Sequence, residues 1–162
     1  MNIINIGFSR AKRWYKVGSV VIAKSEARDY SHVYVEYTCQ ITGVELIAQA
    51  SHGMVNLMNK VIFLENNIIA KQYVLQCTDK QNLDIMTFIA NSLGTPYSMS
   101  QVLLLGIKTA FKFQIKSYNK DKYYICSEFA ARLCKILDIV MPEELDYVTP
   151  SDLDRILSEV SR

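Results

Sequence analysis

Residues 30–37 read YSHVYVEY, a run of β-branched and aromatic residues that is typical of a strand. Residues 43–50 (GVELIAQA) form a second such run, and the turn sequence Gln40-Ile41-Thr42-Gly43 joins the two. A short turn that ends in glycine between two strand-forming runs predicts an antiparallel hairpin. The hairpin indicates that the first half of the chain forms β-structure.

Further strands are predicted on both sides of the hairpin. They share a short apolar run bounded by turn residues, and they are residues 17–24, 53–57, 61–64 and 70–77. Short strands at this spacing, with turns between them, predict a small meander or barrel.

The second half of the chain predicts helices. Residues 79–93 stop at Gly94 and carry apolar residues at helical spacing, which are Leu83, Met86, Ile89, Ala90 and Leu93. Residues 101–115 predict a second helix. Residues 123–137 predict a third, whose apolar stripe is Phe129, Leu133, Ile136 and Leu137.

Residues 149–152 (TPSD) supply an N-cap and a first turn, so a last short helix is predicted there. Because strands come first, helices follow, and no repeat or boundary interrupts them, the sequence predicts one α+β domain over residues 1–162.

Composition limits the classes of protein to which the chain can belong. The 162 residues are 50% hydrophobic and 21% charged, which excludes whole-chain disorder and predicts a compact soluble domain. A net charge of +2 is too small to indicate nucleic-acid binding. The most apolar segment, residues 102–113, is far shorter than the ~20 residues that span a bilayer, so no stable membrane insertion is expected.

The N-terminal residues 1–16 alternate apolar and basic residues and lack the apolar stretch of a signal peptide. The expected location is therefore the cytoplasm of the producing cell. The four cysteines include no C-x-x-C pair, which indicates free thiols and no metal site.

A lysine-rich stretch covers residues 108–122. Two interpretations stay open for it. The lysines form a solvated face, or they face an anionic surface such as a cell-wall polymer or phospholipid headgroups.

Cys126 has the sequence context that most suggests chemistry. It lies in residues 123–129 (YYICSEF), where an extended aromatic run gives way to the third predicted helix. The start of a helix favours the thiolate, the nucleophilic form of cysteine, and its N–H groups are able to bind an oxyanion. The alternative is a small buried hydrophobic residue, and Cys39, Cys77 and Cys134 fit that interpretation.

His32 is the candidate base for such a thiolate. Alternation along a strand puts His32, Tyr34 and Glu36 on one face, so Tyr34 is expected to line the same side of the site. The alternative for a single histidine in a strand is a hydrogen-bonded structural residue.

Gln49 interrupts an apolar run on the next strand. Across a hairpin its side chain is able to reach the second ring nitrogen of His32 and fix the tautomer, as the third member of a catalytic triad does. Glu45 and His52 are the alternatives for that third role.

Several segments, in chain order, carry a resemblance to a known family. They are Ser31-His32-Val33-Tyr34-Val35, Ile47-Ala48-Gln49-Ala50 with Gly53-Met54-Val55, Leu93-Gly94-Thr95-Pro96-Tyr97, and Tyr124-Ile125-Cys126-Ser127-Glu128-Phe129. Their order and spacing resemble the permuted NlpC-type papain-like cysteine hydrolases, in which the histidine precedes the cysteine. This superfamily includes cell-wall peptidase-like proteins, poxvirus and phage members, and the lecithin:retinol acyltransferase group. Residues 6–9 and 148–153 are similar to phage-encoded members in particular, which implies the virion as an alternative location.

The resemblance implies a role for each matching residue. Cys126 matches the nucleophile, His32 the general base and Gln49 the polar third residue. The superfamily often has His, Glu or Asn at this third position, so Gln49 is a departure. A neutral glutamine orients the imidazole but does not stabilise imidazolium as a carboxylate does.

Substrate binding is implied for Tyr97 and Tyr124, which match aromatic positions beside the active-site cleft, and Tyr34 is assigned with them. Packing in the core or cleft wall is the alternative role for these tyrosines. The implied fold is papain-like, an antiparallel sheet or partial barrel with the Cys126 helix packed against it.

The implied function is a cysteine hydrolase that forms an acyl-enzyme on Cys126. It acts on a peptide or amide bond, with peptidoglycan stem peptides as the leading substrate and phage structural proteins as further partners. No metal or cofactor is implied, because a thiolate–imidazole pair suffices for acyl transfer.

Two alternatives stay open. The first is a lipid acyltransferase or thioesterase, suggested by the lecithin:retinol relatives and by the apolar, lysine-edged residues 102–116. The second is a non-enzymatic virion or interaction protein that keeps the fold.

Overall fold

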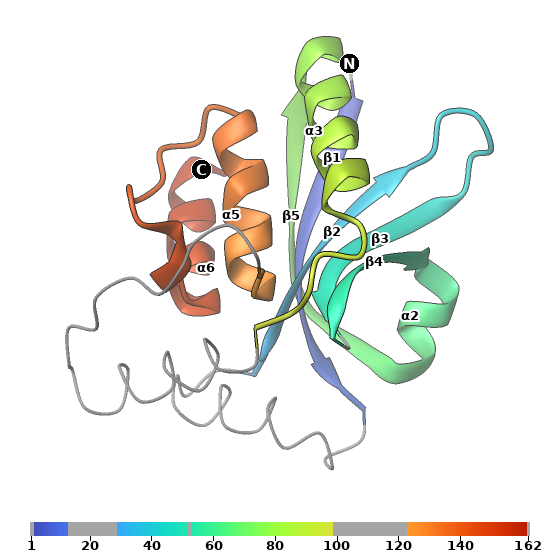
Figure 1. Cartoon of the computed structure of the whole chain (residues 1–162), viewed down its shortest axis with the longest axis horizontal. Helices are drawn as coiled ribbons and strands as arrows, with labels where there is room; N and C mark the ends of the chain where they lie inside the picture. The colour runs from blue at the N-terminus through green and yellow to red at the C-terminus, as the bar shows by residue number, and fades with distance from the viewer. Residues whose placement is uncertain (1, 13–28, 52, 99–122, 162) are drawn as a thin grey trace.

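The structure is a computed structural model that describes residues 2–12, 29–51, 53–98 and 123–161 (Figure 1). The strands are β1 (Asn2–Ala11), β2 (His32–Thr38), β3 (Glu45–Ser51), β4 (Met54–Asn59) and β5 (Asn67–Cys77). The helices are α2 (Lys60–Asn66), α3 (Asp79–Ser92), α5 (Cys126–Ile136) and α6 (Pro150–Val160), with a 3₁₀ turn at Leu145–Tyr147. The predicted α+β class is confirmed.

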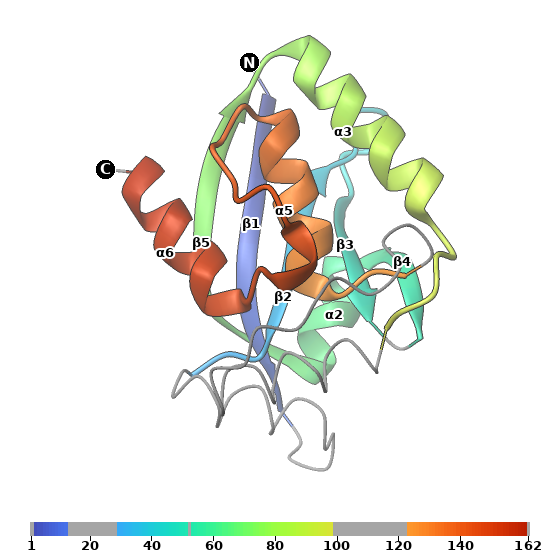
Figure 2. The ribbon, with the colours of Figure 1, turned by 60° about the vertical axis from the view of Figure 1, so that its left-hand side comes forward.

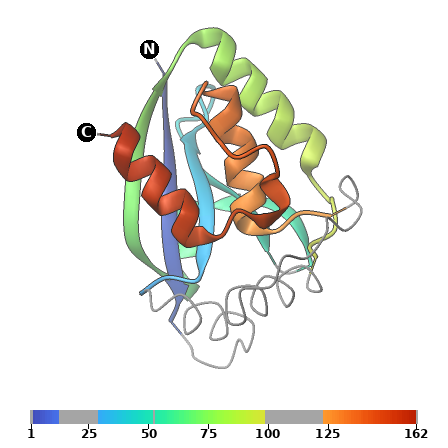
Figure 3. The same cartoon turned by 90° about the vertical axis from the view of Figure 1, so that its left-hand side faces the viewer.

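The strands form one antiparallel sheet in the order β4-β3-β2-β1-β5 (Figure 1). Helices α3, α5 and α6 lie over one face of this sheet (Figures 2 and 3), and α2 lies on the other side. The predicted strand at 17–24, the predicted helix at 101–115 and the lysine-rich stretch 108–122 lie outside the described residues. None of the helices within the described residues is long and apolar enough to cross a membrane.

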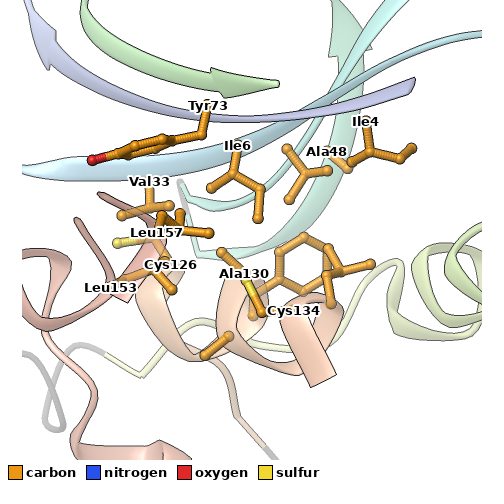
Figure 4. Close-up of a cluster of buried hydrophobic side chains, with 14 of the residues drawn as sticks. Ile4, Ile6, Val33, Ala48, Tyr73, Cys126, Ala130, Cys134, Leu153 and Leu157 are labelled. Atoms are coloured by element: carbon orange, nitrogen blue, oxygen red, sulfur yellow. The ribbon is translucent and has the colours of Figure 1, made fainter. Parts of the chain in front are cut away.

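Alternation along the strands separates two cores. The main core lies between the sheet and the helices α3, α5 and α6, and Figure 4 shows Ile6, Val33 and Ala130 in it. The second, smaller core lies under α2 and consists of Tyr34, Ile47 and Phe63. Each strand therefore sends alternate residues to different helices, as a sheet covered on both faces requires.

The predicted hairpin at residues 40–43 is confirmed, since β2 and β3 pair with Val35 opposite Ala48. The turn is closed by the backbone N–H of Gly43, which donates to the carbonyl of Cys39 at 2.8 Å. Gly43 has φ 68, a conformation that glycine adopts without strain. The predicted strands at 53–57 and 70–77 correspond to β4 and β5.

Strand β1 is a strand that the sequence prediction missed, and it lies in the sheet between β2 and β5. The missed signal is the period-two alternation of Ile4, Ile6 and Phe8, all of which are buried in the main core. Gly7, on the other face, is a position where only glycine fits. A Cβ atom there would lie 2.1 Å from the Tyr34 ring on β2.

The predicted strand at residues 61–64 is wrong, because these residues lie in the helix α2. The Asn59 side chain caps this helix by accepting from the N–H of Val61 at 2.8 Å. Of the residues of α2 only Phe63 is buried, so the apolar run contributes one side chain to a core and pairs with no strand. A short apolar run cannot be assigned to helix or strand by periodicity alone.

The predicted helix at 79–93 is confirmed as α3, but its buried face differs from the predicted stripe. Ile85, Ile89 and Ser92 are buried, whereas Leu83 and Leu93 are exposed. The predicted last helix is confirmed as α6. There Thr149 accepts from the N–H of Asp152 at 3.1 Å, and the Asp152 carboxylate accepts from the N–H of Thr149 at 3.2 Å, a complete capping box.

A buried carboxylate attaches α6 to the sheet. Asp154 accepts hydrogen bonds from the Tyr30 hydroxyl at 2.7 Å, the Tyr73 hydroxyl at 2.6 Å and the Lys71 ammonium at 2.7 Å. Burial raises the pKa of Asp154, and the hydrogen bonds from Lys71, Tyr73 and Tyr30 lower it. The lowering is larger, so the net shift of the pKa is downward. The ionised carboxylate is therefore the form that holds α6.

Replacing Asp154 by asparagine is expected to lower the free energy of unfolding at pH 7 by about 3 kcal/mol, since a buried acceptor of charge-assisted hydrogen bonds is lost. A lowered folded-state pKa contributes stability above the unfolded value of about 3.9, and this contribution is lost as pH falls through the folded pKa. The gap between the two proteins should therefore shrink in urea titrations below about pH 4. Glu159→Gln, at an exposed ion pair with Arg155, is the control and should change stability by under about 0.5 kcal/mol.

Candidate functional site

Cys126 is the first residue of α5. The residue before it, Ile125, has extended backbone, and no side chain within the described residues caps the helix. The predicted position of Cys126 at a helix start is therefore confirmed. The first N–H groups of a helix and its dipole favour negative charge at this point. α5 packs against β2 and β3, the strands that carry the other two candidates, His32 and Gln49.

Backbone hydrogen bonds join the segment at Pro96 and Tyr97 to the residues just before Cys126. The N–H of Tyr97 donates to the carbonyl of Gly53 at 2.8 Å, and the N–H of Tyr124 donates to the carbonyl of Pro96 at 3.0 Å. Tyr97 and Tyr124 pair in a parallel bridge, and Pro96 pairs with Met54, so the segment at Pro96 and Tyr97 links the start of β4 to the residues just before α5. The three segments of the family resemblance that surround the cysteine are thus joined in space.

The Tyr97 side chain contacts the Cys126 side chain. Burial, followed by the charge of Cys126 and a hydrogen bond between the two side chains, raises the pKa of the Tyr97 hydroxyl above its usual value. The hydroxyl therefore stays protonated and is able to donate to a thiolate or to an oxygen bound next to it. Tyr97 belongs to the thiol's immediate surroundings.

Tyr124 packs against the main core beside the start of α5. Its ring makes edge contacts with Phe88 and Phe129 at 6.2 and 6.1 Å between centroids, and the Arg132 guanidinium lies 5.2 Å from the ring centre. Arg132 also donates to the buried carboxylate of Glu128 at 2.9 Å. These contacts account for Tyr124 as a packing residue between α3 and α5.

His32 and Gln49 meet as predicted. His32 is the first residue of β2, and its Nε2 lies 2.6 Å from the Gln49 side-chain oxygen. Because an amide oxygen only accepts, Nε2 carries the proton of this hydrogen bond. In a neutral ring, Nδ1 is therefore the nitrogen that carries the lone pair.

The two alternatives for the third role differ in their position. The Glu45 carboxylate accepts from the Lys60 ammonium at 3.0 Å, at the far end of β3 from Gln49. His52 lies outside the described residues. Gln49 is the partner of His32 in the structure, while its catalytic role stays a prediction.

The face of β2 that carries His32 is not the face that contacts α5. Alternation puts Val33 and Val35 in the main core under α5, and His32 on the side of Tyr34 and Gln49. His32 stands at the strand end, where the chain enters β2, and it is half-buried. Cys126 and His32 thus lie at one end of the sheet on different sides of β2, and their direct pairing stays a prediction.

Tyr34 has a different place from the one its substrate-binding assignment requires. It shares a face with His32 and Glu36, as predicted, but its ring is fully buried against Phe63, with centroids 4.7 Å apart, and against Gly7. The structure therefore makes Tyr34 a core residue of the sheet. Glu36, on the same face, is buried and accepts from Lys60 at 2.9 Å.

The four cysteines differ in the environment of their sulfur atoms. Burial raises the pKa of Cys77, and it raises that of Cys134 to about 12. Hydrogen bonds from Thr42 and Ile41 lower the pKa of Cys39, which is half-exposed. Cys126 is 3% exposed, in the same layer as Val33 and Leu157 (Figure 4). Cys39 is therefore the accessible competitor in any test of thiol reactivity.

In a Cys39→Ser background, iodoacetamide at pH 7 is expected to modify Cys126 at least about 10-fold faster than Cys77 or Cys134, because only Cys126 stands at a helix start. Peptide mapping over time measures the order of labelling. The change His32→Ala should slow labelling of Cys126 and leave the other rates unchanged. Earlier labelling of Cys134, or no effect of His32→Ala, would count against a Cys126–His32 pair.

One polar residue of this region was missed by sequence analysis. Asn56 on β4 lies opposite Gln49 in the sheet register, and its side-chain oxygen accepts from the Gln49 amide at 3.3 Å. The signal in the sequence was that Asn56 is polar at the position that faces Gln49 across the β3–β4 hairpin. Across the described residues, His, Cys, Asp and Glu side chains do not gather in groups of three that would suit a metal ion.

No family model matches the chain, and no curated protein matches it.

Proposed function

We propose that the protein is a papain-like cysteine hydrolase of the permuted NlpC type, with Cys126 as nucleophile, His32 as general base and Gln49 as the residue that orients His32. The observation that carries the proposal is the 2.6 Å hydrogen bond between His32 Nε2 and the Gln49 oxygen. In a neutral ring it puts the lone pair on Nδ1, and Cys126 is the first residue of α5, the helix that packs against β2. A thiol and an imidazole form the pair that acyl transfer by cysteine requires, and an amide partner orients the imidazole.

The proposed reaction has two steps. In the first, His32 takes the proton of the Cys126 thiol, the sulfur attacks the carbonyl carbon to form a C–S bond, and the C–N bond breaks as His32 passes that proton to the leaving amine. In the second, water attacks the thioester, His32 accepts a proton from it, and the acid product leaves with the thiol restored. The helix N–H groups and the Tyr97 hydroxyl are the donors proposed to bind the oxyanion.

The proposed substrate is a peptide or amide bond, and peptidoglycan stem peptides are the leading class, on the basis of the family resemblance. The experiment incubates the whole chain with purified peptidoglycan and with synthetic stem peptides, and mass spectrometry detects new carboxyl and amine ends. Phospholipid vesicles form a parallel arm. Release or transfer of fatty acid there, without peptide cleavage, would replace the peptidase with the lipid acyltransferase or thioesterase.

A second function is favoured by one observation. Cys126 is 3% exposed and Gln49 is 2% exposed, so the proposed nucleophile and the orienting amide are covered by protein. A non-enzymatic interaction protein that retains the fold has no need to open this site. Absence of product in both arms, together with a Cys126 that iodoacetamide does not modify, would establish that alternative.

A further inference from the structure

A chain of side-chain amides runs from the β3–β4 hairpin to His32. The Asn56 amide nitrogen donates to the backbone carbonyls of Ser51 at 3.0 Å and Met54 at 3.2 Å. The Asn56 oxygen accepts from the Gln49 amide nitrogen at 3.3 Å. The Gln49 oxygen in turn accepts from His32 Nε2 at 2.6 Å. The three side chains come from neighbouring strands β4, β3 and β2.

The direction of this chain is set at the hairpin. A backbone carbonyl only accepts, so the two carbonyls fix which end of the Asn56 amide faces them, and the Asn56 oxygen must face Gln49. An oxygen there requires the nitrogen of Gln49, and the Gln49 oxygen is then left for His32. Each amide is able to take only one of its two orientations.

Burial strengthens this ordering. Gln49 is 2% exposed, so water does not compete for its amide group. Its nitrogen has a second contact, at 3.5 Å from the Met58 sulfur, which is a weak acceptor. Turning the Gln49 amide around would place two oxygens together at Asn56 and an N–H group against the proton on Nε2, which is costly in a buried site.

We propose that Asn56 is a positioning residue, which transmits the polarity of the hairpin carbonyls through Gln49 and holds neutral His32 in the Nε2–H tautomer. The proposal deepens the proposed function and rests on it for its catalytic consequence, because a base on Nδ1 needs this tautomer. The tautomer itself is measurable without any turnover. Failure of the hydrolase proposal is therefore distinguishable from failure of this one.

The experiment is ¹⁵N NMR of the imidazole nitrogens in the whole chain at a pH where His32 is neutral. The chain has two histidines, so a His52→Gln variant assigns the signals. In the parent, His32 should be in the Nε2–H form. In Asn56→Leu, the Nδ1–H form should rise at least about three-fold, because the Gln49 amide is then free to turn around.

The control is Met58→Leu, which removes the other contact of the Gln49 nitrogen and keeps the side chain's size. It should leave the tautomer of His32 unchanged. An Nδ1–H form in the parent would overturn the proposal without any variant, and an unchanged tautomer in folded Asn56→Leu would also overturn it. An equal change in Met58→Leu would overturn the special role of Asn56 by showing that any disturbance beside Gln49 has the same effect.

Discussion

Replacing Cys126 by alanine is expected to reduce kcat on the peptide substrate by at least about 10³-fold, since the nucleophile that forms the acyl-enzyme is removed. The fold should persist, because one small buried side chain replaces another at the first turn of α5. Circular dichroism and the urea midpoint check this point. Kinetics with the stem peptide found in the cleavage assay measure the loss.

The matched control for Cys126→Ala lies in the same helix. Cys134→Ala also removes a buried sulfur from α5, but burial raises the pKa of that thiol and it stands away from the helix start. We expect kcat to remain within about three-fold of the parent, with stability lowered by about 1 kcal/mol. Mass spectrometry should find an acyl-thioester on Cys126 alone. Comparable kcat in Cys126→Ala and the parent would remove Cys126 from the reaction.

The features that sequence predicted correctly depend on neighbours in the chain. The β2–β3 turn needs only Gly43 at a positive φ, and the start of α6 needs only Thr149 and Asp152. The hydrogen bond from His32 to Gln49 follows from parity once the hairpin is correct. For these features, the local signal and the tertiary structure agree.

The features that sequence analysis missed are decided by contacts between distant segments. The alternation along β1 is a local signal, but its place beside β2 depends on a distant contact, because the Tyr34 ring occupies the space that a Cβ atom at Gly7 would take. The run at Val61 became a helix because Asn59 caps it and Phe63 reaches the second core. Alternation alone gives the face of Tyr34 but not which helix covers that face.

The candidate site shows the same division. Placing Cys126 at a helix start was a local inference, and it holds. Whether Cys126 reaches His32 is a tertiary question, because α5 contacts the face of β2 that carries Val33, while His32 stands at the strand end on the side of Gln49. Sequence periodicity carries no information about how a strand end is positioned relative to a helix start. For this reason the pairing is best tested through the amide that orients the histidine.

Gln49→Ala is expected to lower kcat by about 10²-fold, since an imidazole that is free to turn loses the geometry and the tautomer that proton transfer requires. Glu45→Ala is the matched control on the same face of β3. Its carboxylate is bound to Lys60, so kcat should stay within about two-fold. Circular dichroism should show a retained fold in both.

The mechanism of the Gln49 effect is separable from a general disturbance of β3. If Gln49 acts through His32, then adding Gln49→Ala to His32→Ala should cost nothing further, because residues that act as one unit are not additive. A purely structural role for Gln49 would instead lower the double variant's kcat by a further factor, together with its urea midpoint. Retained activity in Gln49→Ala would show that Cys126 and His32 suffice as a dyad. In that case the neutral amide would serve the packing of β3 rather than the chemistry, and the departure from the family's usual third residue would carry no catalytic cost.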